Sequence, residues 1–152
     1  MENKKKGIKR HESLYPLSHH HHDALFLALK LRRAGTEKSK LTVDEIKSEL
    51  NQFWDPGGQQ HFREEEEILL PAYAQYANID KPEITEMLLE HVSVRSLVDK
   101  IQKAETELEP MMRELGDLLE SHVRKEERII FPMIEEALPE QVLLELEPYW
   151  HR

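Results

Sequence analysis

Apolar residues recur at intervals of three or four along most of the chain, which is the spacing of one face of an α-helix. In the first such stretch they are Leu17, Ala24, Leu25, Ala28, Leu29 and Leu31. The pattern predicts four long helices and a short closing one. The first two long helices cover Tyr15–Arg33 and Thr42 to about Ala77. The third begins at Pro82 and ends at a turn between Ala104 and Pro110, and the fourth runs from that turn through Ile130. The short helix covers Glu140–Glu147.

Local signals mark where these helices start and bend. Thr42-Val43-Asp44-Glu45 is a capping-box pattern, in which threonine and glutamate satisfy free backbone N–H groups at a helix start. Pro82 suits the first turn of the third helix, because proline has no N–H to leave unpaired there. Asp55-Pro56-Gly57-Gly58 should break or kink the second helix, and Pro71 should bend it again.

Short connections join the four long helices, so the expected fold class is all-α. We expect an antiparallel four-helix bundle of two αα-hairpins with pseudo-two-fold symmetry, plus a short C-terminal helix. At 152 residues the chain is long enough for one domain with its own core. A loose, polar and basic N-terminal arm is expected over residues 1–13, and the bundle over residues 14–152.

One stretch occurs twice, once in the second helix and once in the fourth. His61-Phe62-Arg63-Glu64-Glu65-Glu66-Glu67-Ile68-Leu69-Leu70-Pro71 corresponds to His122-Val123-Arg124-Lys125-Glu126-Glu127-Arg128-Ile129-Ile130-Phe131-Pro132. Each copy sets a histidine four residues before a glutamate, and positions i and i+4 lie on the same helix face. Two such helices that face each other would bring two imidazoles and two carboxylates together.

The other two helices carry further histidines on their predicted apolar faces. His91 falls on the stripe of the third helix with Met87 and Val94. On the first helix periodicity leaves the choice open, because His21 and His22 both have apolar residues three and four positions away. The candidate ligands are therefore His61, Glu65, His91, His122, Glu126 and one of His21 and His22.

Such a set predicts a binuclear site for a borderline metal such as iron, manganese or zinc. Carboxylates can bridge two cations and offset the cost of burying charge. Glu127 competes with Glu126, which the i+4 spacing and the match to Glu65 favour. Glu64, Glu66 and Glu67 are interpreted mainly as a solvated face. The chain has no cysteine, so any metal must use nitrogen and oxygen ligands.

Charge and composition narrow the possible partners. The chain has 30 acidic and 21 basic residues and a net charge of −9, which argues against binding nucleic acid. No window of about 18 apolar residues predicts a membrane span, and the basic start lacks the apolar core of a signal peptide, so we expect a cytoplasmic protein. The run from His19 to His22 opens an amphipathic helix, whereas an affinity tag normally stands at a terminus.

From about Tyr15 to Leu146 the sequence resembles the hemerythrin-like family, also called the HHE cation-binding domain. The match is carried by His21-His22-Asp23-Ala24-Leu25, the two His-x-x-x-Glu segments, the lone His91 and Phe131-Pro132. The resemblance implies an antiparallel four-helix bundle around two iron ions with an oxo or hydroxo bridge, with manganese or zinc as alternative occupants. By motif position it implies Glu65 and Glu126 as bridges and His22, His61, His91 and His122 as terminal ligands.

One position departs from the family pattern. Oxygen-carrying hemerythrins have a further histidine one turn beyond His91, where this chain has Arg95, which cannot ligate a metal. This argues against reversible oxygen carriage, and another residue such as Glu64, or a water, would fill the gap. We expect a protein that binds or senses a diatomic or peroxide ligand (oxygen, nitric oxide or peroxide) or iron. The alternatives are turnover of peroxide or nitric oxide, with Arg95 stabilising anionic species, and a metal-storage or structural bundle.

Overall fold

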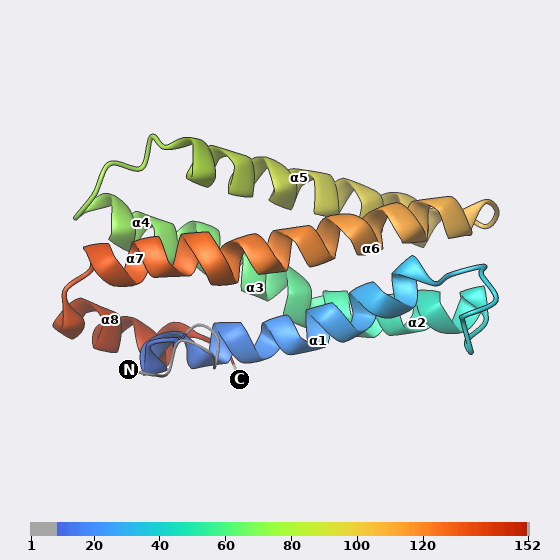
Figure 1. The fold of residues 1–152 in the computed structure, drawn as a ribbon, viewed down its shortest axis with the longest axis horizontal. Coiled ribbons are helices and arrows are strands. Elements are labelled where there is room, and N and C mark those ends of the chain that lie inside the picture. The colour runs from blue at the N-terminus through green and yellow to red at the C-terminus, as the bar shows by residue number, and fades with distance from the viewer. Residues whose placement is uncertain (1–8, 152) are drawn as a thin grey trace.

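The computed structural model describes residues 9–151, and every regular element in that range is helical (Figure 1). The α-helices are α1 (Tyr15–Arg32), α2 (Val43–Phe53), α3 (Gln59–Glu64), α4 (Leu70–Ala74), α5 (Pro82–Lys103), α6 (Leu108–Lys125), α7 (Phe131–Ala137) and α8 (Glu140–Leu146). Between them lie the π-helical turns η3 (Trp54–Gly58), η4 (Glu65–Leu69) and η5 (Glu126–Ile130). The 3-10 turns η2 (Glu12–Leu14) and η6 (Glu147–Tyr149) flank the bundle.

The long elements form four rods that alternate in direction (Figure 1). The rods are α1, the run from α2 to α4, α5, and the run from α6 to α7. Helix α6 packs along both α1 and α5, and α8 folds back to contact η2. The predicted all-α bundle of two αα-hairpins is confirmed. None of the helices within residues 9–151 has the length and apolar character needed to cross a membrane.

The predicted start and break of the second rod are both present. Thr42 Oγ1 accepts a hydrogen bond from the Glu45 N–H at 3.1 Å, and the Glu45 carboxylate accepts one from the Thr42 N–H at 2.8 Å. Asp55 has non-helical backbone angles (φ −120°, ψ 104°), so the rod is kinked at the predicted place. Pro82 stands at the start of α5 as expected.

Both copies of the repeated stretch contain a widened turn just before their proline. Proline has no N–H and cannot donate to the carbonyl four residues back, so the α-helical ladder is interrupted at Pro71 and Pro132. The residues before them form the π-helical turns η4 and η5, which begin at Glu65 and Glu126. The bend predicted at Pro71 is thus a local widening. Such turns recur at functional sites because they re-aim side chains.

The apolar core consists of two clusters with a polar belt between them. One cluster fills the α2 end of the bundle and includes Leu27, Ile46, Leu50, Val98 and Met112. The other fills the α8 end and includes Leu17, Tyr73, Met87, Phe131 and Leu143. On every rod the change from one cluster to the other falls at a buried histidine or glutamate. The repeated motif therefore lies at mid-height of the bundle.

The segment before α1 is packed more tightly than the predicted arm. Residues 1–8 of that arm lie outside the described range. Arg10 is buried, its guanidinium lies 3.1 Å from the carboxylates of Glu127 and Glu135, and it covers the ring of Phe131. Trp150 Nε1 donates to the carbonyl of Ser13 at 2.7 Å. The expectation of a loose chain up to residue 13 is therefore wrong from Arg10 onward.

Candidate metal centre

The histidine that α1 contributes to the bundle interior is His21, and the prediction of His22 is wrong in this respect. His21 is 2% exposed and lies on a buried stripe with Leu17 and Ala24, whereas His22 faces solvent. Phe26, the expected neighbour of His22 on an apolar face, is 68% exposed. Helix α1 carries apolar residues on its solvent side as well, so periodicity could not distinguish the two faces.

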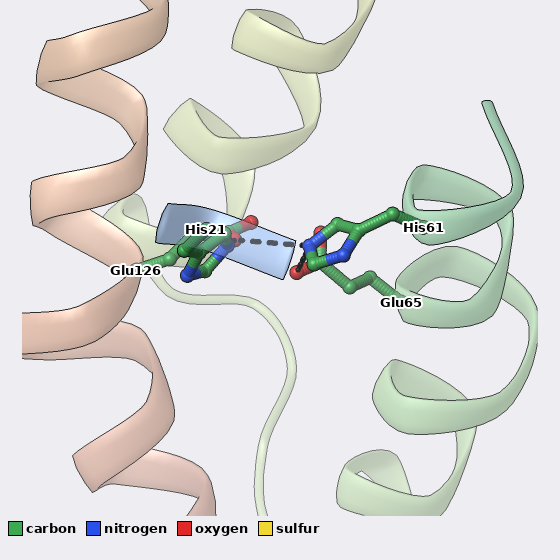
Figure 2. A group of neighbouring side chains, drawn as sticks. All are labelled: His21, His61, Glu65 and Glu126. Atoms are coloured by element: carbon green, nitrogen blue, oxygen red, sulfur yellow. Dashed lines mark hydrogen bonds and ion pairs between the residues drawn. The ribbon is translucent and has the colours of Figure 1, made fainter. Parts of the chain in front are cut away.

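Six buried side chains from the four rods meet in the polar belt. They form two overlapping groups that share both glutamates: His21, His61, Glu65 and Glu126 (Figure 2), and Glu65, His91, His122 and Glu126. Within each group the potential ligand atoms all lie within 4.8 Å of one another. The structure thus brings together the predicted residues, with His21 in the place expected for His22.

Glu65 opens the widened turn η4 and is completely buried. Its Oε2 lies 2.9 Å from His61 Nε2, one helical turn away on the same rod. Its Oε1 lies 3.1 Å from His91 Nε2 on α5. One carboxylate therefore presents an oxygen to each of two histidines that belong to different groups.

Glu126 opens η5 and repeats this arrangement from the opposite rod. Its Oε1 lies 2.9 Å from His21 Nε2, and its Oε2 lies 3.0 Å from His122 Nε2. The neighbouring Glu127, which competed with it in the sequence, is partly exposed and accepts a hydrogen bond from Ser18 at 2.7 Å. Glu126 is the member of the pair that joins the cluster, as the i+4 spacing predicted.

Several of the cluster atoms lack a hydrogen-bond partner among the described residues. They are both oxygens of Glu65 and the Nε2 atoms of His61 and His122. Each of these atoms lies within ion-pair distance of an oppositely charged cluster residue, but none of them makes a hydrogen bond there. Leaving a buried polar atom unpaired costs about 1–3 kcal/mol, so a cation between them would remove a penalty. A set of imidazoles and carboxylates suits a borderline divalent metal, and the residues present fit one.

Three of the four cluster imidazoles are held from behind by another carboxylate. Their Nδ1 atoms contact an outer glutamate: His21 with Glu127 (2.6 Å), His91 with Glu66 (2.6 Å) and His122 with Glu90 (2.7 Å). A contact of this kind fixes the ring so that Nε2 faces the metal. His61 differs, because its Nδ1 is buried without a partner in the described chain and its ring stacks on His20 instead.

Arg95 and Glu64 have other roles than those considered from the sequence. Arg95 donates to both oxygens of Glu66, at 2.8 and 3.1 Å, and its guanidinium lies over the ring of Phe62, so it acts on the cluster through these two neighbours of His91. Glu64 is 5% exposed and accepts a hydrogen bond from the backbone N–H of His151 at 2.9 Å. Neither side chain belongs to the groups of potential ligands.

The outer carboxylates were missed by sequence reasoning, which placed Glu66 on a solvated face. Glu66 and Glu127 each directly follow a cluster glutamate, and this repeated Glu-Glu pair was the available signal. Glu90 precedes His91 but contacts His122 on the next rod. Only the packing of α5 against α6 reveals that contact.

In the metal-free state the cluster is a network of buried charges. Burial lowers the pKa of His61, but Glu65 and Glu126 outweigh it and raise that pKa to about 10. By the same balance the pKa of His91 is raised to about 10 and that of His122 to about 9. Burial raises the pKa of Glu126, but His122 and other histidines hold it well below its usual value. A cation competes with these protons, so its affinity should increase with pH.

A family model described as the hemerythrin HHE cation binding domain matches residues 13–134. The matched range includes all six cluster residues and most of the bundle. Comparisons with curated proteins and with solved structures gave no match. The chain belongs to the hemerythrin HHE cation-binding domain family, and its buried histidine–glutamate cluster fits the metal site that membership implies.

Proposed function

We propose that this member of the hemerythrin HHE family holds two iron ions and uses them to bind or sense oxygen, nitric oxide, peroxide or iron itself. The observation that carries the proposal is the bridging geometry, in which each buried glutamate presents one oxygen to each pair of histidines. The ligands would be His21 and His61 for one ion, His91 and His122 for the other, with Glu65 and Glu126 shared.

The number of ligands supports a site that is open to an external molecule. Each ion would receive two imidazoles and two carboxylate oxygens from the chain. Iron in such surroundings commonly takes about six ligands, which leaves room for an oxo or hydroxo bridge and an external ligand. Bound iron would supply redox chemistry and affinity for small ligands, while the chain positions the ions and keeps bulk water away.

A small cavity beside the cluster supports a small ligand. It borders His21, His61 and His122, its other walls are mainly apolar, and its volume is about 20 Å³. A space of that size holds about one water molecule. The cavity therefore fits a diatomic or peroxide ligand and excludes a bulky organic substrate in this conformation.

Metal analysis of protein purified without added metal tests the proposal. We expect about two irons per chain, an absorption band typical of bridged iron pairs, and spectral changes on adding oxygen, nitric oxide or peroxide. Two zinc ions, or none, together with no spectral response after iron loading, would contradict it.

Enzymatic turnover has weaker support as a second candidate. The sequence suggested that Arg95 stabilises anionic species at the metals, but its guanidinium is paired with Glu66 at 2.8 Å. That pairing neutralises the charge on which the idea depends. Steady-state assays with peroxide or nitric oxide and a reductant would still detect turnover if another group performs it.

A further inference from the structure

A histidine-rich groove lies on the surface beside the cluster. Its walls include His19, His20, His22 and Asp23 from α1, and His151 from the C-terminal end of the described chain. His19, His22 and Asp23 are exposed, and the rings of His19 and His22 stack with centroids 6.0 Å apart. None of these residues belongs to the buried cluster. We call this feature the outer groove.

His20 separates the outer groove from the interior. It lines the outer groove and also the cavity that borders the cluster. Its ring stacks on Phe53 and on His61, with centroids 4.9 and 4.8 Å away. His151 meets its edge at 5.5 Å and is itself fixed by Glu64 through Nδ1. One imidazole ring thus lies between the surface and the His61 side of the cluster.

The chemistry of the outer groove suits a transition-metal cation. His19 and Asp23 are spaced i, i+4, and His19 and His22 are spaced i, i+3, so all three project from one side of the helix. Imidazole and carboxylate ligands favour borderline divalent metals. Exposed side chains change rotamer on the picosecond to nanosecond scale, so the stacked rings can turn to chelate an ion. The net charge of −9 also favours the approach of cations.

We propose that the outer groove is a separate, solvent-facing site that captures a divalent transition-metal ion before the ion passes His20 into the buried cluster. The route would end at His61, the cluster imidazole whose Nδ1 has no hydrogen-bond partner in the part of the chain that the structure describes. The proposal depends on the proposed function in one respect, namely that the buried cluster binds metal.

The first test asks whether the outer groove binds an ion of its own. Iron-loaded protein is titrated with Co²⁺ by calorimetry. One additional ion should bind, more weakly than the buried pair, and this binding should be lost in the double variant His19→Gln, His22→Gln. Unchanged Co²⁺ binding in the double variant would overturn the proposal.

The second test asks whether that ion serves the cluster. Metal-free protein is mixed with Co²⁺, a chelator stops the uptake at set times, and tightly held metal is counted. A capture site raises the local metal concentration, so the double variant should load about tenfold more slowly while reaching the same final count. An unchanged rate would overturn the proposal.

A matched control separates position from mere binding capacity. Ser93 and Ser96 are exposed on α5 with the same i, i+3 spacing. Adding Ser93→His and Ser96→His to the double variant should restore a weak Co²⁺ site without restoring the loading rate. Restored loading would show that location is irrelevant and would contradict the proposed route. Absence of the tightly held ions in every variant would instead contradict the proposed function.

Discussion

The two halves of the cluster have the same ligand types but different surroundings. Around His91 and His122, both Nδ1 atoms contact outer carboxylates, and those carboxylates are paired with cations of the chain: Glu66 with Arg95 and Glu90 with Lys125. The ring of Phe62 stacks on His91 with centroids 3.8 Å apart and an interplanar angle of 6°. Both imidazoles of this half are therefore held in place by contacts on the side away from the other cluster residues.

The half formed by His21 and His61 is less constrained at His61, although Glu127 behind His21 is likewise paired with a cation of the chain, Arg10. Glu127 contacts His21 Nδ1, but His61 Nδ1 has no hydrogen-bond partner within residues 9–151. His61 borders the cavity and stacks on His20, beyond which lies the outer groove. The sequence repeat thus gives both halves the same inner ligands, and the outer contacts make these ligands unequal. We expect a firmly held ion between His91 and His122 and a more exchangeable one between His21 and His61.

The largest effect should come from removing a shared carboxylate, because that abolishes both halves together. Glu126→Gln keeps the size of the side chain but removes the negative charge that both halves share and replaces one of the two oxygens with an amide nitrogen, which does not ligate a metal. Metal content should fall from about two ions to well under one per chain. Elemental analysis measures this, with the exposed Glu67→Gln as control. Retention of one firmly held ion would show that Glu126 serves only one half.

Single histidine variants should affect the halves unequally. His61→Leu removes a ligand from the less constrained half, so about one ion per chain should remain between His91 and His122. His122→Leu removes a fixed ligand, and competition with a chelator should then strip both ions, because only the weaker half is intact. Metal content after dialysis against a chelator measures the difference. Equal retention in both variants would refute the inequality of the halves.

A smaller effect is expected in the pH dependence of the metal-free protein. The pKa values of His61 and His91 are about 10 in the folded state, against 6.5 for an ordinary histidine. Their contribution to stability is therefore complete below pH 6.5 and is lost as the pH rises towards 10. The free energy of unfolding should fall by roughly a few kcal/mol over that range, which denaturant titration measures. Iron-loaded protein should lack this fall, since a ligating imidazole is already neutral and has no proton on the ligating nitrogen to lose.

The same titration tests whether the two halves of the cluster carry equal charge. Because His61 and His91 have similar raised pKa values, His61→Leu and His91→Leu should flatten the pH curve of the metal-free protein to a similar extent. The halves would then be alike in charge and differ only in their outer contacts. If the pH curve changes clearly more in one variant than in the other, the two halves differ in the charges of their inner residues instead.

The sequence predicted the features that depend on local rules. The capping box at Thr42, the kink at Asp55 and the position of Pro82 follow from backbone chemistry within a few residues, and all are present. The pairing of His61 with Glu65 also follows from the helix repeat. These predictions needed no knowledge of how the rods pack.

The features that were missed depend on packing between rods. His21 and His22 are adjacent residues that point to different sides of α1, and only packing against the other rods decides which of the two is buried. Glu90 contacts His122 because α5 and α6 meet in one particular register. Neither fact is encoded by the spacing of residues along a single helix.

The smallest predicted effect concerns the outer carboxylates, which act on the metal only through the histidines. Glu66→Gln leaves His91 in place but removes the negative charge behind its Nδ1, and loss of such a contact typically costs about 10- to 100-fold in metal affinity. The affinity for the ion between His91 and His122 should then fall towards the affinity for the ion between His21 and His61. Removal of metal by a chelator, biphasic in the native protein, should become close to a single phase.

Glu67→Gln, which changes the next residue of η4 at an exposed position, should leave two phases. If Glu66→Gln also leaves two phases, Glu66 does not cause the difference between the halves, and the contact of Glu90 with His122 and the stacking of Phe62 on His91 would be the remaining causes.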